Sequence, residues 1–377
     1  MKIGKLIKQP SGYKAFIPDK FPPVPGINLN PKTQQLHAKA SLMVGKLDGI
    51  TQLLPDLDFF IFMYIRKEAA RSSEIEGTKA TMVDVIKTEA EIDNKLPEDV
   101  DRILHYIKAM NYGLKRVEEL PLSLRFIREV HRVLLKGTVD APGKTPGEFR
   151  KSQNWIGGGS PNTAKFVPPP PTEMTHALDD LEKFLYSEDE YLPLIKAALV
   201  HAQFETIHPF LDGNGRTGRL LTTFYLCKLG ILERPALYLS EYFLNNQKAY
   251  YDALNIYHSE NGDVAVWLDF FLDGIAIIAA EAVEVSKKIN DLTKKDTIKI
   301  QSLGRRAKTG MTVLENLYKL PIINVRKVEE WTGLSRTQAN ELVQKLIGLN
   351  ILEQRNKEVE YGREFRYKDY LKLFTNE

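Results

Sequence analysis

Apolar positions recur with helical spacing over most of the chain, which predicts a mainly helical protein. The first thirty or so residues are rich in proline and predict an extended arm that is ordered only by lying on something else. Helical spacing covers residues 36–94, and the helix at 56–73 is expected to end before Gly77, since glycine is common just past a helix C-terminus. Further helices are expected at residues 99–118, 122–135, 172–186, 192–207, 216–229, 245–255 and 265–289.

A stretch rich in glycine and proline, residues 143–171, interrupts these helices. Two short apolar pieces, at 154–157 and 165–167, flank the sequence Gly-Gly-Gly-Ser-Pro-Asn-Thr-Ala. This pattern predicts a β-hairpin with a loose tip.

The last 75 residues or so predict a winged helix-turn-helix. A short helix at 325–332 is followed by a turn at Gly333 and by a capping box from Ser335 that opens a helix to about residue 349. Apolar pieces at 351–353 and 365–367 then bracket a charged loop. The candidate contacts to nucleic acid are Arg336, Gln338, Asn340 and Gln344 in the second helix and Lys357, Arg363 and Arg366 in the wing.

Composition adds limits on class and location. The 377 residues are 43% hydrophobic and 27% charged, as in ordinary globular proteins of two or three domains. We place the boundaries at 1–95, 96–289 and 290–377. The single cysteine, Cys227, excludes an internal disulfide and gives no sign of a zinc fold. Without a signal peptide or a long apolar run, a cytoplasmic protein with no membrane partner is expected.

The net charge of +3 is unevenly distributed. Residues 286–377 contain 19 Lys and Arg against 12 Asp and Glu. A nucleic-acid surface would therefore be sought at this end, near a basic linker at about 286–308.

The candidate chemistry lies in one segment, His208-Pro-Phe210-Leu-Asp212-Gly-Asn-Gly-Arg-Thr-Gly-Arg219, where a helix is expected to begin. Backbone N–H groups at a helix N-terminus form an anion site, and arginine guanidinium groups bind phosphate oxygens in pairs. A carboxylate at Asp212 beside phosphates indicates a divalent cation between them. His208 has the side chain and the near-neutral pKa of a general base. The residues of this anion site are Gly213, Asn214, Gly215, Arg216 and Arg219.

This segment resembles the signature of the Fic family, which is His, any residue, Phe, any residue, Asp or Glu, Gly-Asn-Gly-Arg, two residues and Arg. The resemblance extends over roughly residues 36–289 and implies a Fic-type helical bundle with a small β-hairpin flap. It implies that His208 deprotonates a protein hydroxyl, Phe210 anchors the loop and Asp212 binds Mg²⁺ or Mn²⁺. It further implies that Asn214 with the glycine amides holds the α-phosphate of ATP. Arg216 and Arg219 would then contact the β- and γ-phosphates.

The segment Ser72-x-x-x-Glu76-Gly77 resembles an inhibitory motif of the same family. Glutamates in the last turn of a helix oppose the helix dipole, and such a local conflict is expected at functional sites. The resemblance implies that Glu76 pairs with Arg219 and occupies the arginine that should receive the γ-phosphate. It also implies that the hairpin at 154–168 aligns the target segment. Tyr250 and Tyr251 are candidates for the adenine pocket.

Other interpretations share these residues. Gly213-x-Gly215-x-x-Gly218 with Glu233 matches a dinucleotide fingerprint, which requires a strand before it. Glu205-x-x-His208 and Glu173-x-x-His176 have the spacing of di-iron bundles. An ordinary polar loop is a third interpretation. His201, seven residues before His208, is expected to be a buried, hydrogen-bonded histidine.

The sequence therefore predicts a nucleotidyltransferase that transfers AMP from ATP to Ser, Thr or Tyr of a target protein and is autoinhibited by Glu76. Self-modification, DNA binding through the winged helix and a homodimer are further hypotheses. Two alternatives stay open: a hydrolase that removes AMP with Glu76 orienting water, and a DNA-binding regulator that senses nucleotide.

Overall fold

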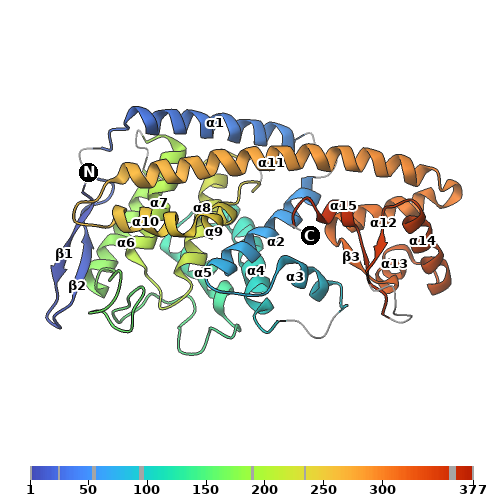
Figure 1. Cartoon of the computed structure of the whole chain (residues 1–377). Coiled ribbons are helices and arrows are strands. Elements are labelled where there is room, and N and C mark those ends of the chain that lie inside the picture. The colour runs from blue at the N-terminus through green and yellow to red at the C-terminus, as the bar shows by residue number, and fades with distance from the viewer. Residues whose placement is uncertain are drawn as a thin grey trace.

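The computed structural model describes residues 2–23, 26–52, 57–92, 97–187, 191–232, 235–355 and 362–375 (Figure 1). The described helices are α1 (Pro31–Thr51), α2 (Leu57–Ile75), α3 (Met82–Glu89), α4 (Val100–Glu119), α5 (Leu124–Leu135), α6 (Pro171–Tyr186), α7 (Pro193–Ile207), α8 (Asn214–Lys228), α9 (Ser240–Asn245), α10 (Gln247–Tyr257), α11 (Val264–Gln301), a 3₁₀ turn (Gly304–Arg306), α12 (Ala307–Lys319), α13 (Val325–Thr332), α14 (Arg336–Gly348) and α15 (Lys368–Leu371). The described strands are β1 (Gly4–Lys8), β2 (Lys14–Pro18), β3 (Ile322–Ile323), β4 (Glu353–Gln354) and β5 (Phe365–Arg366). The fold is mainly helical, as the sequence predicts.

Two long helices, α1 and α11, lie side by side along one side of the molecule (Figure 1). The Asn30 side chain caps α1 by accepting a hydrogen bond from the Thr33 amide at 2.9 Å. The Thr33 hydroxyl donates to Asp269 of α11 at 2.6 Å. α11 continues to Gln301, so the linker expected at 286–308 is mostly helical. The expected domain boundary at 289/290 falls inside this helix, and the boundary at 95/96 lies outside the described residues.

The N-terminal arm is a β-hairpin, which the sequence pattern did not predict. β1 and β2 pair antiparallel, with Lys8 opposite Lys14. The Phe16 amide donates to the Val167 carbonyl at 2.9 Å, and the Phe16 side chain is fully buried. The arm therefore lies against the end of the predicted flap. Within that flap, Ile156 and Phe166 form an antiparallel bridge, which confirms a hairpin there.

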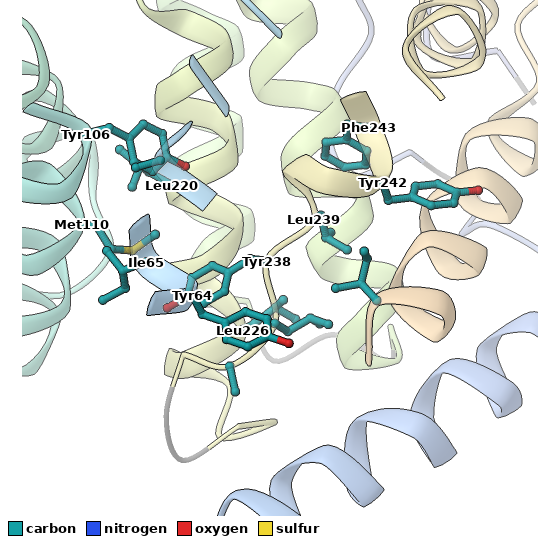
Figure 2. Close-up of a cluster of buried hydrophobic side chains, with 14 of the residues drawn as sticks. Tyr64, Ile65, Tyr106, Met110, Leu220, Leu226, Tyr238, Leu239, Tyr242 and Phe243 are labelled. Atoms are coloured by element: carbon teal, nitrogen blue, oxygen red, sulfur yellow. The ribbon is translucent and has the colours of Figure 1, made fainter. Parts of the chain in front are cut away.

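Apolar packing fixes α2 against α4 and against α8, the helix that contains Asn214 and Arg219. Figure 2 shows Tyr64 and Ile65 of α2 near Met110 of α4. The other labelled members of this cluster are Tyr106, Leu220, Leu226, Tyr238, Leu239, Tyr242 and Phe243. Burying one large apolar side chain contributes about 1.5–3 kcal/mol, so the cluster holds α2 firmly beside α4 and α8.

The C-terminal segment contains a helix-turn-helix followed by a small sheet. α13 ends at Gly333, whose φ of 67° is left-handed, and Ser335 forms a capping box with Gln338 at the start of α14. The short strands are ordered β3-β5-β4. The Arg363 guanidinium donates to the Asn340 side chain at 2.8 Å. Lys357 lies outside the described residues, and the assignment as a winged helix that binds DNA stays a prediction.

No helix among the described residues is long and apolar enough to cross a membrane.

Candidate active site

α7 is buried on every side, and the candidate site begins at its C-terminal end. Every side chain from 194 to 207 is buried, including several polar ones. His201 is one of these, and its two ring nitrogens face the hydroxyls of Thr222 at 2.9 Å and Tyr250 at 3.0 Å. This confirms His201 as a buried, hydrogen-bonded histidine.

α7 ends at His208, whose backbone is left-handed with φ of 49° and ψ of 61°. This conformation costs of order 1–3 kcal/mol for a residue other than glycine, so the surroundings must enforce it. The His208 carbonyl accepts hydrogen bonds from Arg150 Nε at 2.9 Å and from Asn154 Nδ2 at 3.3 Å. Arg150 also donates to the Pro169 carbonyl at 2.6 Å. Arg150 and the flap residue Asn154 thus fix the loop, a role that sequence reasoning missed.

The imidazole of His208 is neutral at neutral pH. Burial and the nearby Arg150 guanidinium lower the pKa of His208 to about 4. A neutral imidazole can accept a proton, as a general base must.

The Phe210 side chain is fully buried in the core, the position that the family resemblance implies for it. Its ring stacks on His131 with a centroid distance of 3.6 Å. The Phe210 amide donates to Asn214 Oδ1 at 2.8 Å, and Asn214 Nδ2 donates to the Phe210 carbonyl at 2.9 Å. The Asn214 side chain therefore closes the loop. The Asn214 backbone lies in the first turn of α8, where its N–H group can meet an anion.

The glycines around the start of α8 leave room for a ligand. Gly213 has a φ of 75°, which strains any other residue. A Cβ at Gly215 would lie 2.4 Å from Glu76 Oε1, so a side chain there would fill the space in front of the helix N-terminus. Unpaired N–H groups in the first turn of a helix bind anions.

Asp212 is partly exposed and directly precedes Gly213. Its Oδ1 accepts the Gly213 amide at 2.6 Å, and Arg216 Nη2 lies 3.8 Å away. The described residues contain no group of three or more His, Cys, Asp or Glu that could bind a metal alone. One carboxylate together with substrate phosphates is a usual arrangement for Mg²⁺, and carboxylate and phosphate oxygens also suit Mn²⁺. The residues therefore fit a cation that arrives with a nucleotide.

Arg216 is buried but incompletely paired. Its Nη2 lies 3.4 Å from Asp140, whereas Nε and Nη1 have no hydrogen-bond partner among the described residues. Unsatisfied buried guanidinium groups are costly, and a phosphate would supply acceptors.

Arg219 contacts the predicted inhibitory residues. Its Nε donates to the Ser72 hydroxyl at 2.8 Å, and its Nη2 donates to the Ser72 carbonyl at 3.0 Å and to Glu76 Oε1 at 2.7 Å. Desolvation acts to raise the pKa of Glu76, but the charge and hydrogen bond of Arg219, together with the charge of Arg216, outweigh it and lower the pKa. Glu76 is therefore a carboxylate paired with Arg219 at neutral pH. Gly77 follows with a φ of 90°.

A cavity of about 720 Å³ is lined by His208, Gly215, Arg219 and Glu76, whereas Asp212 and Arg216 are not among its lining residues. Tyr250 and Tyr251 of α10 both line it, but Tyr250 is almost fully buried while Tyr251 is 41% exposed. Other residues in the wall include Trp155, Ile156 and Glu205. The cavity thus joins the candidate base, the helix N-terminus, the inhibitory carboxylate and the flap.

The structure does not favour the two rival motifs. The glycines at 213–218 follow helix α7 rather than a strand, and Glu233 lies outside the described residues. His176 is exposed on α6, so the two Glu-x-x-His pairs do not form one metal site.

Comparison with protein families matches two segments. Residues 121–226 match the Fic/DOC family, and residues 34–115 match the Fic/DOC family N-terminal region. Among curated proteins, the chain is 32% identical over 205 residues to protein adenylyltransferase Fic of Drosophila grimshawi and to that of Drosophila virilis. Each match covers 53% of this chain and 39% of the relative, so the chain spans about two fifths of the length of these relatives.

Solved structures share the fold. A Fic family protein from Desulfovibrio desulfuricans G20 aligns with a TM-score of 0.58 and 19% identity, covering 90% of this chain and 97% of the other. A Fic domain-containing signaling protein from Bacteroides thetaiotaomicron VPI-5482 aligns with a TM-score of 0.51 and 21% identity, covering 69% of this chain and 97% of the other. These likenesses concern the fold alone.

Proposed function

The chain belongs to the Fic/DOC family, and on this premise we propose that it is a protein adenylyltransferase that transfers AMP from ATP to a hydroxyl group of a target protein. The name protein adenylyltransferase of its relatives supports this activity. The target residue is Ser, Thr or Tyr.

One observation carries the proposal. A neutral histidine, His208, and the helix N-terminus at Gly215 line the same cavity, together with Arg219. A base on one side of an anion site is the arrangement that hydroxyl attack on a phosphate requires.

The chemistry follows from these positions. His208 accepts the proton of the target hydroxyl while the hydroxyl oxygen forms a bond to the α-phosphorus. The bond from that phosphorus to the β-phosphate oxygen breaks, and pyrophosphate leaves with the electron pair. The backbone amides at the start of α8 stabilise the negative charge on the α-phosphate, so that positioning and electrostatics supply most of the acceleration.

The remaining groups bind the polyphosphate. Arg216, with two unpaired guanidinium nitrogens, faces the β-phosphate, and Arg219 faces the γ-phosphate. Asp212 holds Mg²⁺ or Mn²⁺, which when bound neutralises phosphate charge. Tyr251 and Tyr250 border the space left for the adenine ring.

Glu76 inhibits transfer by occupying Arg219. While the ion pair at 2.7 Å is intact, the guanidinium is not free for a γ-phosphate. Target binding uses the flap, where Trp155 is 39% exposed beside the cavity and the Ile156 backbone pairs with Phe166. An extended target segment can add to this hairpin by main-chain pairing.

The test is to incubate Glu76→Gly protein with Mg²⁺ and ATP labelled on the α-phosphate, alone and with a cell lysate. Peptides that gain AMP are then identified by mass spectrometry. Glu76→Gly/His208→Ala is the matched control and should transfer little. If Glu76→Gly transfers no AMP to itself or to any lysate protein, the proposed activity is wrong.

A further inference from the structure

Glu205 is a buried carboxyl group in the wall of the cavity. It lies in the last turn of α7 and is 8% exposed. Its Oε1 has no hydrogen-bond partner among the described residues. A Cβ at Gly218 would lie 2.5 Å from this Oε1, so the missing side chain at Gly218 makes room for the carboxyl group.

The carboxyl group faces the ring of the candidate base. Glu205 Oε2 lies 3.9 Å from His208 Nδ1, which is too far for a hydrogen bond. His208 Nδ1 also has no well-aligned hydrogen-bond partner among the described residues, although the nearby Glu205 backbone favours the protonated ring. Leaving a buried polar group unpaired is unfavourable, and a catalytic role is one of the explanations for such groups in native proteins. One proton shared between the Glu205 carboxyl group and His208 Nδ1 would give the ring nitrogen a partner.

We propose that Glu205 is a positioning residue for His208: its carboxylate accepts a hydrogen bond from Nδ1–H when nucleotide and target close the site, which leaves Nε2 as the base. The inference rests on the proposed AMP transfer. Hydrogen bonds between catalytic groups are often long in unliganded enzymes and shorten in the reactive complex.

The step balances without any further reactant. The proton of the target hydroxyl goes to His208 Nε2, the new oxygen–phosphorus bond forms and pyrophosphate leaves. The imidazolium ion that results would be unfavourable in a buried site, and the Glu205 carboxylate compensates its charge. A carboxylate that orients a histidine in this way is a recurrent device in hydrolases.

The surroundings set the protonation of Glu205. The groups that face it are Glu76 after α2, Arg219 of α8, Tyr250 and Tyr251 of α10, and His208. Burial raises the pKa of Glu205 to about 7, although Arg219 lowers it, and the Glu76 charge raises it further. Glu205 therefore becomes a carboxylate as the pH rises through about 7. His208 is already neutral above pH 5, because its pKa is about 4.

This difference allows a decisive measurement of rate against pH. In Glu76→Gly protein, the rate constant for AMP transfer onto the protein itself should rise near pH 7 or somewhat below, since the Glu76 charge is gone. Adding Glu205→Gln should lower the rate at pH 8 by at least about 10-fold, and by no more than the 10² to 10⁴ that a general base itself contributes. It should also abolish the rise near pH 7 and leave the KM for ATP nearly unchanged.

The matched control is Glu173→Gln, which lies in the other Glu-x-x-His pair on the surface of α6, away from the cavity. It should keep both the rate and the pH profile. Circular dichroism and the melting temperature show whether Glu205→Gln folds. If it does not, Glu205→Asp keeps the charge but shortens the side chain, and should lower the rate while retaining a rise with pH.

A second readout does not depend on AMP transfer. With ¹⁵N-labelled histidine, the His208 ring, assigned with His208→Ala, should report a titration near pH 7 that disappears in Glu205→Gln. If no variant transfers AMP, the proposed activity fails and this spectrum alone decides the inference. Unchanged His208 resonances in Glu205→Gln, or a parental rate and pH profile, would overturn the role of Glu205.

Discussion

The active-site loop, residues 208–219, and the inhibitory segment, residues 72–77, meet at Arg219 but are stabilised in different ways. The loop is closed by reciprocal hydrogen bonds between Phe210 and Asn214 and is fixed from outside by Arg150. The inhibitory segment is the end of a helix, and Glu76 reaches the loop through one hydrogen bond to Arg219. The Glu76 side chain is 39% exposed.

The comparison separates what builds the site from what blocks it. None of the contacts that fix His208, Phe210 and Asn214 involves Glu76. Arg219 would also keep its two contacts to Ser72 if Glu76 were removed. Inhibition should therefore be removable without disturbing the catalytic geometry, and the following predictions test this separation.

The largest effect is expected from His208→Ala in the Glu76→Gly background. Transfer should fall by about 10² to 10⁴, because the site loses its base while the anion site stays intact. The rate of AMP transfer checks the loss of the base. The affinity for magnesium ATP, measured by calorimetry, checks that the anion site is intact. A variant that transfers at the parental rate would remove His208 from the mechanism.

Loss of the cation should have the next largest effect. Asp212→Asn in the same background should lower transfer by roughly 10² to 10³, since metal stabilisation of phosphate charge is worth several kcal/mol. Excess chelator should stop the parental protein, and added Mg²⁺ or Mn²⁺ should restore it. Full activity in chelator would contradict the role of Asp212.

A gain is expected when the inhibitory carboxylate is removed. Glu76→Gly should raise transfer, including onto the protein itself, by roughly 5- to 150-fold, which is what a coupling of about 1–3 kcal/mol supplies. Initial rates with labelled ATP measure the gain. In the double mutant with Arg219→Ala most of it should vanish, because the inhibition acts through that arginine. A lower rate in Glu76→Gly would instead favour a hydrolase in which Glu76 orients water.

Sequence reasoning located the loop because its residues are neighbours in the chain. His208 and Asp212 lie in one short loop, and Arg219 lies in the second turn of the helix that follows. Their spacing alone therefore indicates a shared site. Arg150 lies 58 residues before His208, and only the folded chain brings its guanidinium to the loop carbonyl. Local sequence carries no signal for such a contact beyond an arginine beside the flap.

Glu205 and the N-terminal arm illustrate two further limits. The spacing of Glu205 and His208 was visible, but it also fits a di-iron site. Only the structure, in which His176 of the second pair is exposed while Glu205 and His208 line one cavity, distinguishes the two interpretations. The hairpin of β1 and β2 contains lysines and lies between prolines, so its alternation of apolar residues is weak. It depends on contacts such as that between Phe16 and Val167, which are distant in sequence.

The smallest effect is expected from Glu74→Gln, which sharpens the comparison within the inhibitory segment itself. Glu74 and Glu76 both lie at the end of α2, yet Glu74 pairs with Arg71 at 2.7 Å and its side chain is 45% exposed. An exposed ion pair is worth about 0–1 kcal/mol, so transfer should change by less than about 5-fold. Initial rates of wild type, Glu74→Gln and Glu76→Gln, measured side by side, check this, and the two variants lose the same charge. If Glu74→Gln activated as strongly as Glu76→Gln, inhibition would depend on the charge or stability of the helix end. The contact with Arg219 would then not be its cause.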